Sequence, residues 1–394
     1  MRAIKSFRLD NFLSFGPESE PFEMGDLNVL IGVNGSGKSN LIEAFELLGS
    51  APTNFASAIR DGGGAPDWIW KGADSIHVAT LDAVLADGTP RGRPLRHRLE
   101  FTAVQSRVEV LDEAIEEASS LPGKDDVYFY YRFQRGRPAV NVVNTEDGKP
   151  RGRHIERTEL EPDQSVLAQL KDSEQYPEIT WLGRQLGGIQ TFREWTFGRY
   201  TNLREPQRTD LPEGRLLPDA SNLSLVLQKI QHVRGNVFDD LLRRFLPRFN
   251  RLSTMVSGNT IQFYLHEPGF SKPIPATRLS DGTLRFIAIL AVLLAPEPPP
   301  LVCLEEPELG LHPDAVALVA EVLKTSAQQM QLLVTTHSDA LVAALSDQPD
   351  ALVACEREGA GTTLRRLDTD QLSELLKDYT LGDLWRMGEI GANP

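Results

Sequence analysis

The sequence predicts an α/β protein built on a mostly parallel sheet that helices cover on both sides. A continuously apolar strand at 27–31 leads into a glycine-rich turn and a helix at 38–48. From residue 280 onward, helical and strand-like segments alternate, which is typical of parallel sheets with helical crossovers. We therefore expect the two ends of the chain to build one α/β domain around a mixed middle region.

Length and composition indicate one large domain with a subdomain, because 394 residues that are 41% hydrophobic can bury a sizeable core. No apolar run reaches the roughly 18 residues that span a bilayer, and the longest, 286–295, is expected to be a core helix. The N-terminus alternates polar and apolar residues, unlike a signal peptide. We expect a cytoplasmic protein with no membrane partner and with Cys303 and Cys355 buried and reduced.

The N-terminal half begins with an alternating strand at 2–9 and continues through the apolar strand and helix already described. Alternating runs between 76 and 145, separated by Asp-Gly, Pro-Gly and Gly-Arg-Pro turns, predict an antiparallel sheet. Within that region, "EVLDEAIEEAS" at 109–119 is interpreted as a charged helix of about three turns.

The middle of the chain changes to a helical pattern from 163 to 250, and a strand hairpin follows with Ser-Gly-Asn at its turn. The last part runs helix, strand (301–306), helix (314–328), strand (331–336), helix (338–345) and strand (351–356). These patterns divide the chain into an N-terminal α/β part (1–75), an antiparallel β region (76–162), an inserted helical subdomain with a hairpin (163–275) and a C-terminal α/β part (276–394).

The net charge of −14 argues against a protein that coats nucleic acid, because a negative surface repels phosphates. Arginine nevertheless gathers in four clusters, at 91–98, 132–137, 151–157 and 243–251. Such clusters are solvated loops and helix faces in one interpretation. In the other they form a face that binds a polyanion such as DNA.

The glycine-rich turn satisfies G-x-x-x-x-G-K-[ST] over Gly32–Ser39, directly after a strand and at the start of a helix. In this context, backbone N–H groups and the helix N-terminus surround the phosphates, the lysine reaches the β- and γ-phosphates, and the serine hydroxyl binds Mg²⁺. The alternative is a glycine-rich turn with a chance lysine. The predicted ATP-binding residues are Asn34, Gly35, Ser36, Gly37, Lys38, Ser39 and Asn40.

Two adjacent carboxylates, Glu305 and Glu306, end an apolar strand in "LVCLEEPELGLHP". In a sheet that also carries the phosphate-binding loop, such a strand delivers one acid to Mg²⁺ and the next to the attacking water. We predict that Glu305 binds the metal together with Ser39 and that Glu306 is the general base. The alternative is an ordinary charged strand end before a proline turn.

Two further segments fit the same chemistry. His337 ends a second apolar strand, where it can contact the γ-phosphate or hold the attacking water, although a lone histidine there is more often a satisfied polar residue. Ser280, Asp281 and Gly282 begin the helix that continues through 286–295, which taken alone is an ordinary N-cap with a glycine turn. Together with the other motifs, this helix start is interpreted as a second helix N-terminus that faces a phosphate.

The phosphate loop, "LSDGT", "LEEPE" and "TTHS", in that order, resemble the heads of ABC-type ATPases, in the branch that contains the SMC, RecF and OLD-type proteins. The resemblance covers about 1–50 and 276–356 strongly, and "LDNFLSFGP" looks like that branch's first strand and turn. "IRDGGG", "DWIWKG" and "YTLGDLWRMGEIG" look like a family of small stand-alone bacterial predicted ATPases, relatives of which occur in anti-phage and DNA-repair gene clusters.

The resemblance implies a head in which two subunits sandwich two ATP molecules with Mg²⁺. Each nucleotide then lies between one subunit's loop and the partner's signature turn, here Ser280, Asp281 and Gly282. The sequence departs from the pattern at Glu305, where an aspartate is usual, and at His312, where many relatives carry an aspartate. The glutamine that couples Mg²⁺ to the accessory domain has no clear counterpart, and Gln105 is the weak candidate.

Three functions stay open at this point. The first is an ATPase that dimerises around ATP and acts as a switch or motor on or near DNA, in repair or anti-phage defence. The second is a nucleotide-gated scaffold that holds a nuclease or toxin partner and turns over slowly. The third, an ABC transporter subunit, is disfavoured because the N-terminus and "LSDGT" are SMC-like.

Overall fold

The structure is a computed structural model that describes residues 3–72, 78–86, 88–120, 123, 126–134, 137–142, 151–154, 159–193, 195–359 and 361–391. The strands are β1 (Ile4–Asp10), β2 (Phe22–Glu23), β3 (Leu27–Ile31), β4 (Val78–Leu85), β5 (Leu95–Val104), β6 (Arg107–Glu117), β7 (Phe129–Gln134), β8 (Arg137–Val142), β9 (Arg151–His154), β10 (Gln190–Phe192), β11 (Gln207–Arg208), β12 (Arg251–Ser257), β13 (Thr260–His266), β14 (Ile274–Pro275), β15 (Leu301–Glu305), β16 (Gln331–Thr335), β17 (Leu352–Glu358) and β18 (Gly361–Arg366). The helices are α1 (Lys38–Ser50), α2 (Phe55–Asp61), α3 (Ala65–Trp68), α4 (Val166–Gln169), α5 (Pro177–Gly187), α6 (Leu223–Phe245), α7 (Asp281–Leu293), α8 (Pro313–Ser326), α9 (Asp339–Ala343), α10 (Thr369–Leu372) and α11 (Leu381–Met387).

The central sheet has the strand order β10-β15-β16-β3-β17-β18 and is parallel except for the last pair. It draws strands from both ends of the chain, which confirms the predicted α/β class with a mostly parallel sheet. Because β3, β15 and β16 run in the same direction, their carboxyl ends lie at one edge of the sheet. That edge carries the glycine-rich turn, the two carboxylates and His337.

Both faces of this sheet are buried, as the continuous apolar strands predict. Val29 and Ile31 belong to a core that includes α7 and α8, whereas Leu30 points into a second core with α1 and the antiparallel sheet. The run at 286–295 is a core helix as expected, since every residue of α7 from Phe286 onward is buried. Cys303 and Cys355 are free and buried. Within the described residues, no helix is long and apolar enough to cross a membrane.

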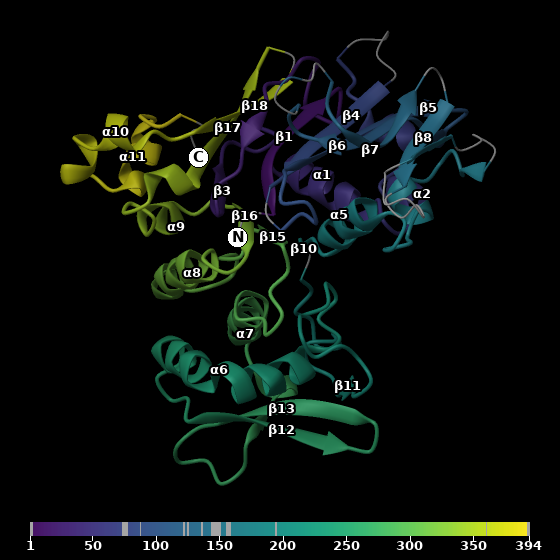
Figure 1. The fold of residues 1–394 in the computed structure, drawn as a ribbon. Coiled ribbons are helices and arrows are strands. Elements are labelled where there is room, and N and C mark those ends of the chain that lie inside the picture. The colour runs from purple at the N-terminus through teal and green to yellow at the C-terminus, as the bar shows by residue number, and fades with distance from the viewer. Residues whose placement is uncertain are drawn as a thin grey trace.

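The antiparallel sheet has the order β2-β1-β4-β5-β6-β7-β8-β9, and Figure 1 shows it at the opposite end of the molecule from α6 and β12. The prediction of a helix at 109–119 is wrong, because these residues belong mostly to β6. Val108 and Val110 face the core while Glu109 and Leu111 do not, so the period is two. A shift in the pairing with β5 at Glu100 disturbs this alternation, which made the segment resemble a helix.

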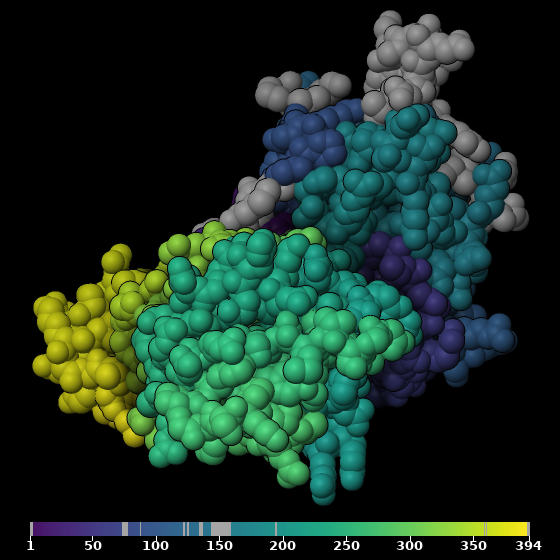
Figure 2. All heavy atoms as spheres, turned by 90° about the horizontal axis from the view of Figure 1, so that it is seen from below, coloured from purple at the N-terminus to yellow at the C-terminus, as the bar shows by residue number. Residues whose placement is uncertain are grey.

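The inserted region contains α6, which has a kink at Arg234, and the predicted hairpin of β12 and β13. Figure 2 shows these elements as a continuous block on the end of the molecule that faces the viewer. The wholly helical interpretation of 163–250 is wrong at β10, which is a strand of the central sheet. The division into four segments stays a proposal. Strand β1, from the first segment, joins the antiparallel sheet, and β10, from the third segment, joins the central sheet.

The C-terminal helix α11 packs on α9, which begins directly after His337 and Ser338. Trp385 is fully buried there, and Thr380 caps α11 through a capping box with Asp383. A Cβ on Gly382 would lie 2.4 Å from the backbone oxygen of Asp339 and 2.9 Å from Cβ of Ala343. The glycine therefore sets how closely the two helices approach.

We expect Gly382→Ala to lower the free energy of unfolding by about 1–3 kcal/mol, because the added methyl forces the two helices apart. Helix propensity alone would give the opposite sign, since alanine is favoured over glycine in a helix by about 1 kcal/mol. Urea denaturation of the two proteins measures the difference. Gly183→Ala on α5 is the matched control, since Gly183 is also helical and its Cβ would meet no atom nearer than 3.6 Å. Equal stability of Gly382→Ala and the parent would contradict this packing argument.

Candidate nucleotide-binding and hydrolysis site

The glycine-rich loop joins β3 to α1 in a conformation that requires glycine. Gly35 and Gly37 have φ values of 78° and 111°, in the left-handed region that side chains rarely adopt. A Cβ on Gly37 would lie 2.3 Å from the hydroxyl oxygen of Thr362, which itself donates a hydrogen bond to the carbonyl of Ser36. Strand β18 thus packs against the loop, and Thr362 is a supporting residue that the sequence motifs do not predict.

Lys38 is buried within the loop, with Nζ 2.7 Å from the carbonyl oxygen of Gly32 and 3.0 Å from that of Val33. Burial lowers the pKa of Lys38, and the charges of Cys355, Glu306 and Glu305 offset part of that effect. A lysine buried next to backbone carbonyls gains from a phosphate anion, because the anion offsets its desolvation.

Several polar groups of the loop fit an anionic ligand. The hydroxyl oxygen of Ser36 is buried without a hydrogen-bond partner. Among the described residues, no acceptor receives a hydrogen bond from the backbone N–H of Gly35, Gly37 or Ser39. Asn34 is exposed at the tip of the loop, and Asn40 is half-buried in the first turn of α1. All seven predicted ATP-binding residues therefore lie on the loop and the start of α1, where a phosphate would bind.

Ser39 and Glu305 are brought together, although they are 266 residues apart in the sequence. The Ser39 hydroxyl donates a hydrogen bond to Oε1 of Glu305, and Nε of Arg193 donates to Oε2 at 3.1 Å. A serine hydroxyl and a carboxylate are oxygen ligands of the kind that Mg²⁺ takes. The longer side chain of glutamate, in place of aspartate, thus reaches the serine directly.

Glu306 and His337 face each other at the same edge, with 3.7 Å between Oε1 of Glu306 and Nε2 of His337. Glu306 has a φ of 45°, an unfavourable conformation for a residue with a side chain and one that occurs at functional sites. Burial lowers the pKa of His337, the positive charge of Lys38 lowers it further, and Glu306 offsets part of this. The lowered pKa favours the neutral imidazole, which can donate one hydrogen bond and accept another.

Glu308 is a nearby carboxylate that the sequence did not single out. Its Oε1 accepts hydrogen bonds from the Thr336 hydroxyl at 2.5 Å and from the backbone N–H of His337 at 3.3 Å, and its other oxygen is buried without a partner. Burial raises the pKa of Glu308, an effect that the bond from Thr336 only partly offsets. Glu308 thus fixes the backbone that carries His337, and the spacing Glu-Pro-Glu was the only sequence signal for it.

The residues of the signature turn, Ser280, Asp281 and Gly282, have their own set of contacts. The Ser280 hydroxyl caps α7 by accepting the backbone N–H of Thr283 at 3.1 Å, and Asp281 pairs with Arg204. A Cβ on Gly282 would lie 3.4 Å from the carbonyl oxygen of Gly310. Among the described residues, no hydrogen bond or ion pair joins Ser280, Asp281 or Gly282 to the phosphate loop.

Three arginines around these groups were not predicted. Arg193 contacts Glu305, Arg204 contacts the signature turn, and Arg285 in α7 lies with its guanidinium carbon 4.6 Å from the ring centre of Phe197. Gln105, the weak candidate for the coupling glutamine, lies in the turn between β5 and β6 with a φ of 49°. The residue that lies beside Glu305 directly after β10 is Arg193.

The arginines of the cluster at 91–98 are all paired with carboxylates. Arg91 lies 2.9 Å from Glu178, Arg93 lies 3.0 Å from Glu117, Arg96 lies 2.7 Å from Asp82, and Arg98 pairs with Glu100. In the cluster at 243–251, Arg243 and Arg244 pair with Asp239 and Glu321, whereas Arg248 and Arg251 form no ion pair within the described residues. The clusters at 132–137 and 151–157 lie partly outside the described residues.

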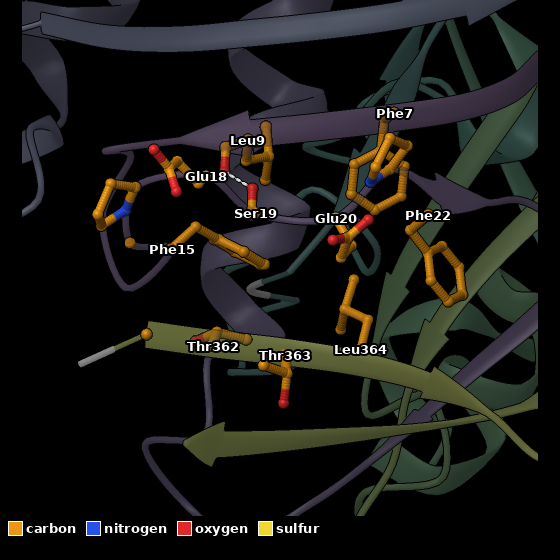
Figure 3. A pocket seen from close by; sticks show the side chains of 14 residues that line it. Phe7, Leu9, Phe15, Glu18, Ser19, Glu20, Phe22, Thr362, Thr363 and Leu364 are labelled. Carbon is orange, nitrogen blue, oxygen red and sulfur yellow. Dashed lines mark hydrogen bonds between the residues drawn. The ribbon is translucent and has the colours of Figure 1, made fainter. Parts of the chain in front are cut away.

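A separate cavity of about 470 Å³ lies between β18 and the turn that precedes β2. Figure 3 shows Phe15, Leu9 and Phe7 on one side and Thr362 to Leu364 on the other. None of the predicted site residues lines it. It is therefore not the phosphate site, although Thr362 belongs to both its wall and the support of the loop.

Comparison with known structures identifies the fold. An SMC head bound to the C-winged helix domain of ScpA has a TM-score of 0.59 at 15% identity, over 94% of this chain and 99% of that one. The SMC head with an extended coiled coil from Pyrococcus furiosus, bound to the C-terminal domain of ScpA, scores 0.56 at 14% identity over 96% and 99%. The SMC head with coiled coil and joint from Pyrococcus yayanosii scores 0.51 at 11% identity over 96% and 99%.

These likenesses show that the chain has the fold of SMC head domains, as the motifs predicted. No curated protein matches the chain. A family model described as "AAA domain, putative AbiEii toxin, Type IV TA system" matches residues 27–343, a span that begins at β3 and includes both carboxylates and His337. The chain therefore belongs to this AAA-domain family of P-loop ATPases.

Proposed function

We propose that the protein binds and hydrolyses ATP as a dimerisation switch and thereby controls a partner macromolecule. The observation that carries this proposal is the convergence of Lys38, Ser39, Glu305 and Glu306 at one edge of the sheet, where Ser39 and Glu305 are in direct contact. Phosphate release from ATP by the purified protein, measured with and without Mg²⁺, tests it. Absence of release under both conditions, together with no ATP binding, would rule out the proposal.

The residues divide the hydrolytic chemistry as follows. Lys38 and the N–H groups of the loop bind the β- and γ-phosphates. Ser39 and Glu305 would hold Mg²⁺, which neutralises phosphate charge when bound. Glu306 orients the attacking water and accepts its proton, and neutral His337 fixes the water or the γ-phosphate by a hydrogen bond. Glu308 keeps His337 in place through its backbone N–H.

Dimerisation is part of the proposal because, among the described residues, no hydrogen bond or ion pair joins the signature turn to the loop of the same chain. The start of α7 offers N–H groups and a positive dipole end, which gain from a phosphate only when a second molecule supplies one. Ser280 and Gly282 would then contact the γ-phosphate held by the partner. The SMC heads that share this fold and are bound to ScpA domains support a head that also engages a partner protein.

The nature of the partner is the finer part of the proposal. The family description names a toxin and a Type IV toxin–antitoxin system, which favours a role in defence with a toxin or nuclease partner. In that form, the ATPase is a nucleotide-gated scaffold with slow turnover. Co-purification with the product of a neighbouring gene supports it, whereas brisk turnover of the isolated protein counts against it.

DNA is the alternative partner, and the paired arginines at 91–98 give it little support. Arg248 and Arg251 are better placed, since no described carboxylate neutralises them. We expect any binding of duplex DNA to weaken steeply with salt, as phosphate contacts require. Fluorescence anisotropy across a salt series, with Arg248→Gln and Arg251→Gln, measures this; equal affinity for all variants would contradict a role of these residues.

We expect the ATPase rate to fall on the acid side of the pH profile with an apparent pKa below the roughly 6.5 of an ordinary histidine. The sign follows from the lowered pKa of His337, because the half-buried imidazole stays neutral to lower pH and its protonation would add a second positive charge near Lys38. Steady-state rates between pH 5 and 8 measure the profile. His337→Ala should lose most of the ATPase rate, and its remaining rate should no longer fall at low pH in this way. An unchanged fall at low pH would show that another group causes it.

A further inference from the structure

One charged cluster at the site joins Glu305 to three residues that have no role in the proposed chemistry. It consists of Arg193 with Glu43, Glu46 and Glu305. The register of β10 with β15 pairs Phe192 with Leu304, so the next residue, Arg193, falls beside Glu305. Nε of Arg193 lies 3.1 Å from Oε2 of Glu305, Nη2 lies 2.9 Å from Oε1 of Glu43, and Nη1 lies 3.7 Å from Oε2 of Glu46. One guanidinium thus joins the end of β15 to the first turns of α1.

Both oxygens of Glu305 are used in this arrangement. Oε1 accepts the Ser39 hydroxyl and Oε2 accepts Arg193. Glu305 is also the carboxylate that would bind a divalent cation with Ser39. A guanidinium and a divalent cation on one carboxylate repel each other strongly at such short range, because the group is only 20% exposed and water screens the charges poorly. The two cations therefore compete.

Glu43 and Glu46 give Arg193 a second place to bind. They lie on α1, and both contact the guanidinium without contributing to the predicted metal site. Burial raises the pKa of Glu46, and the charge of Arg193 offsets part of this rise. The guanidinium therefore favours the ionised form of Glu46. Three carboxylates surround one arginine, and the excess negative charge attracts a further cation.

We propose that Arg193 competes with the divalent cation for Glu305: the guanidinium holds this carboxylate in the nucleotide-free protein and moves fully onto Glu43 and Glu46 when the cation binds. Arg193 is a positioning residue that sets the cation affinity of the site. This inference rests on the proposed function, in which Ser39 and Glu305 hold Mg²⁺.

Aromatic residues that follow Arg193 connect its movement on cation binding to the signature turn. Phe192, Trp195 and Phe197 pack edge to face, with ring centres 5.6 Å and 6.3 Å apart. Arg204 then donates a hydrogen bond to the carbonyl of Phe197 at 3.2 Å and to that of Leu279 at 2.6 Å. Movement of Arg193 therefore reaches the residue that precedes Ser280, on the face expected to meet the second subunit.

The test is the affinity for Mn²⁺, followed by electron paramagnetic resonance at saturating ADP, which requires no hydrolysis. We expect Arg193→Gln to bind Mn²⁺ about tenfold more tightly than the parent, because the competitor and its repulsion are both removed. Arg193→Lys keeps the charge but loses the planar fork, so its affinity should lie between the two. Arg184→Gln, an exposed arginine on α5 with no ion pair among the described residues, is the matched control and should equal the parent.

Equal or weaker binding of Mn²⁺ by Arg193→Gln overturns the inference while leaving the proposed function intact. Failure of the parent itself to bind Mn²⁺ with ADP overturns both, because Ser39 and Glu305 then form no metal site. If Arg193→Gln does not fold, Arg193→Lys decides: tighter binding than the parent supports competition, and equal or weaker binding contradicts it.

Fluorescence gives an independent reading of the linked movement. Trp195 is half-buried, and its indole N–H is buried without a hydrogen-bond partner. Addition of Mg²⁺ to the ADP complex should change the Trp195 emission, measured as the difference between the parent and Trp195→Phe, and this change should be absent in Arg193→Gln. An identical change of Trp195 emission in the parent and in Arg193→Gln would show that Arg193 does not link cation binding to the surroundings of Trp195.

Discussion

Glu306→Gln should abolish ATP hydrolysis while preserving ATP binding, with a fall in rate of about 10²–10⁴-fold, the range that general-base catalysis contributes. Glutamine keeps the size and the hydrogen bonds of the side chain but cannot accept the proton of the attacking water. Since the loop, Lys38 and Ser39 are untouched, the ATP-bound dimer should accumulate. Phosphate release measures the first effect, and size-exclusion chromatography with light scattering measures the second.

Glu174→Gln is the control for this variant, because Glu174 is exposed and, among the described residues, its side chain forms no hydrogen bond or ion pair with the site. It should hydrolyse ATP and elute as the parent does. Hydrolysis by Glu306→Gln at the parent rate would show that another group acts as the base. Loss of ATP binding in the same variant would show instead that Glu306 has a structural role.

Lys38→Met should weaken ATP binding by about 10- to 100-fold, since a hydrogen bond to a charged group contributes about 1.5–3 kcal/mol. Lys38 is buried, and among the described residues its ammonium donates hydrogen bonds to backbone carbonyls alone, so the methionine side chain fits without leaving a buried donor or carboxylate bonded to it unpaired. Hydrolysis should be lost with binding, in contrast to Glu306→Gln. Isothermal titration calorimetry with ATP analogues measures the affinity.

Lys171→Met serves as the control for charge removal, because Lys171 is exposed and has no ion pair among the described residues. Thermal denaturation should show that Lys38→Met folds as the parent does. Unchanged ATP affinity in a folded Lys38→Met protein would place the phosphate site elsewhere.

The central sheet and the phosphate loop could be predicted from the sequence because their determinants are local. Strand β3 is continuously apolar, and Gly35 and Gly37 occupy left-handed positions that few other residues can take. Helix α7 was predictable for the same reason, since its apolar residues form one uninterrupted run. Residue roles at the site remain proposals, but their convergence at one sheet edge follows from parallel strands that end together.

The errors arose where the deciding interaction is long-range. Strand β6 carries five glutamate and aspartate side chains, and only its pairing with β5 and β7 makes it a strand. Strand β10 has three residues, too few for a periodic pattern. Arg193 lies 112 residues from Glu305 in the sequence, so their contact exists only once β10 joins β15.

In the proposed dimer, each subunit supplies half of an ATP site. Mixing Lys38→Met with Ser280→Arg subunits tests this most directly, because each variant alone lacks one half at both sites. In a mixed dimer, one site combines the intact loop of the Ser280→Arg subunit with the intact signature turn of the Lys38→Met subunit. We predict that the mixture regains about a quarter of the parent ATPase rate, since half of randomly mixed dimers carry one complete site of two. A mixture that stays as inactive as either variant alone would contradict a shared site.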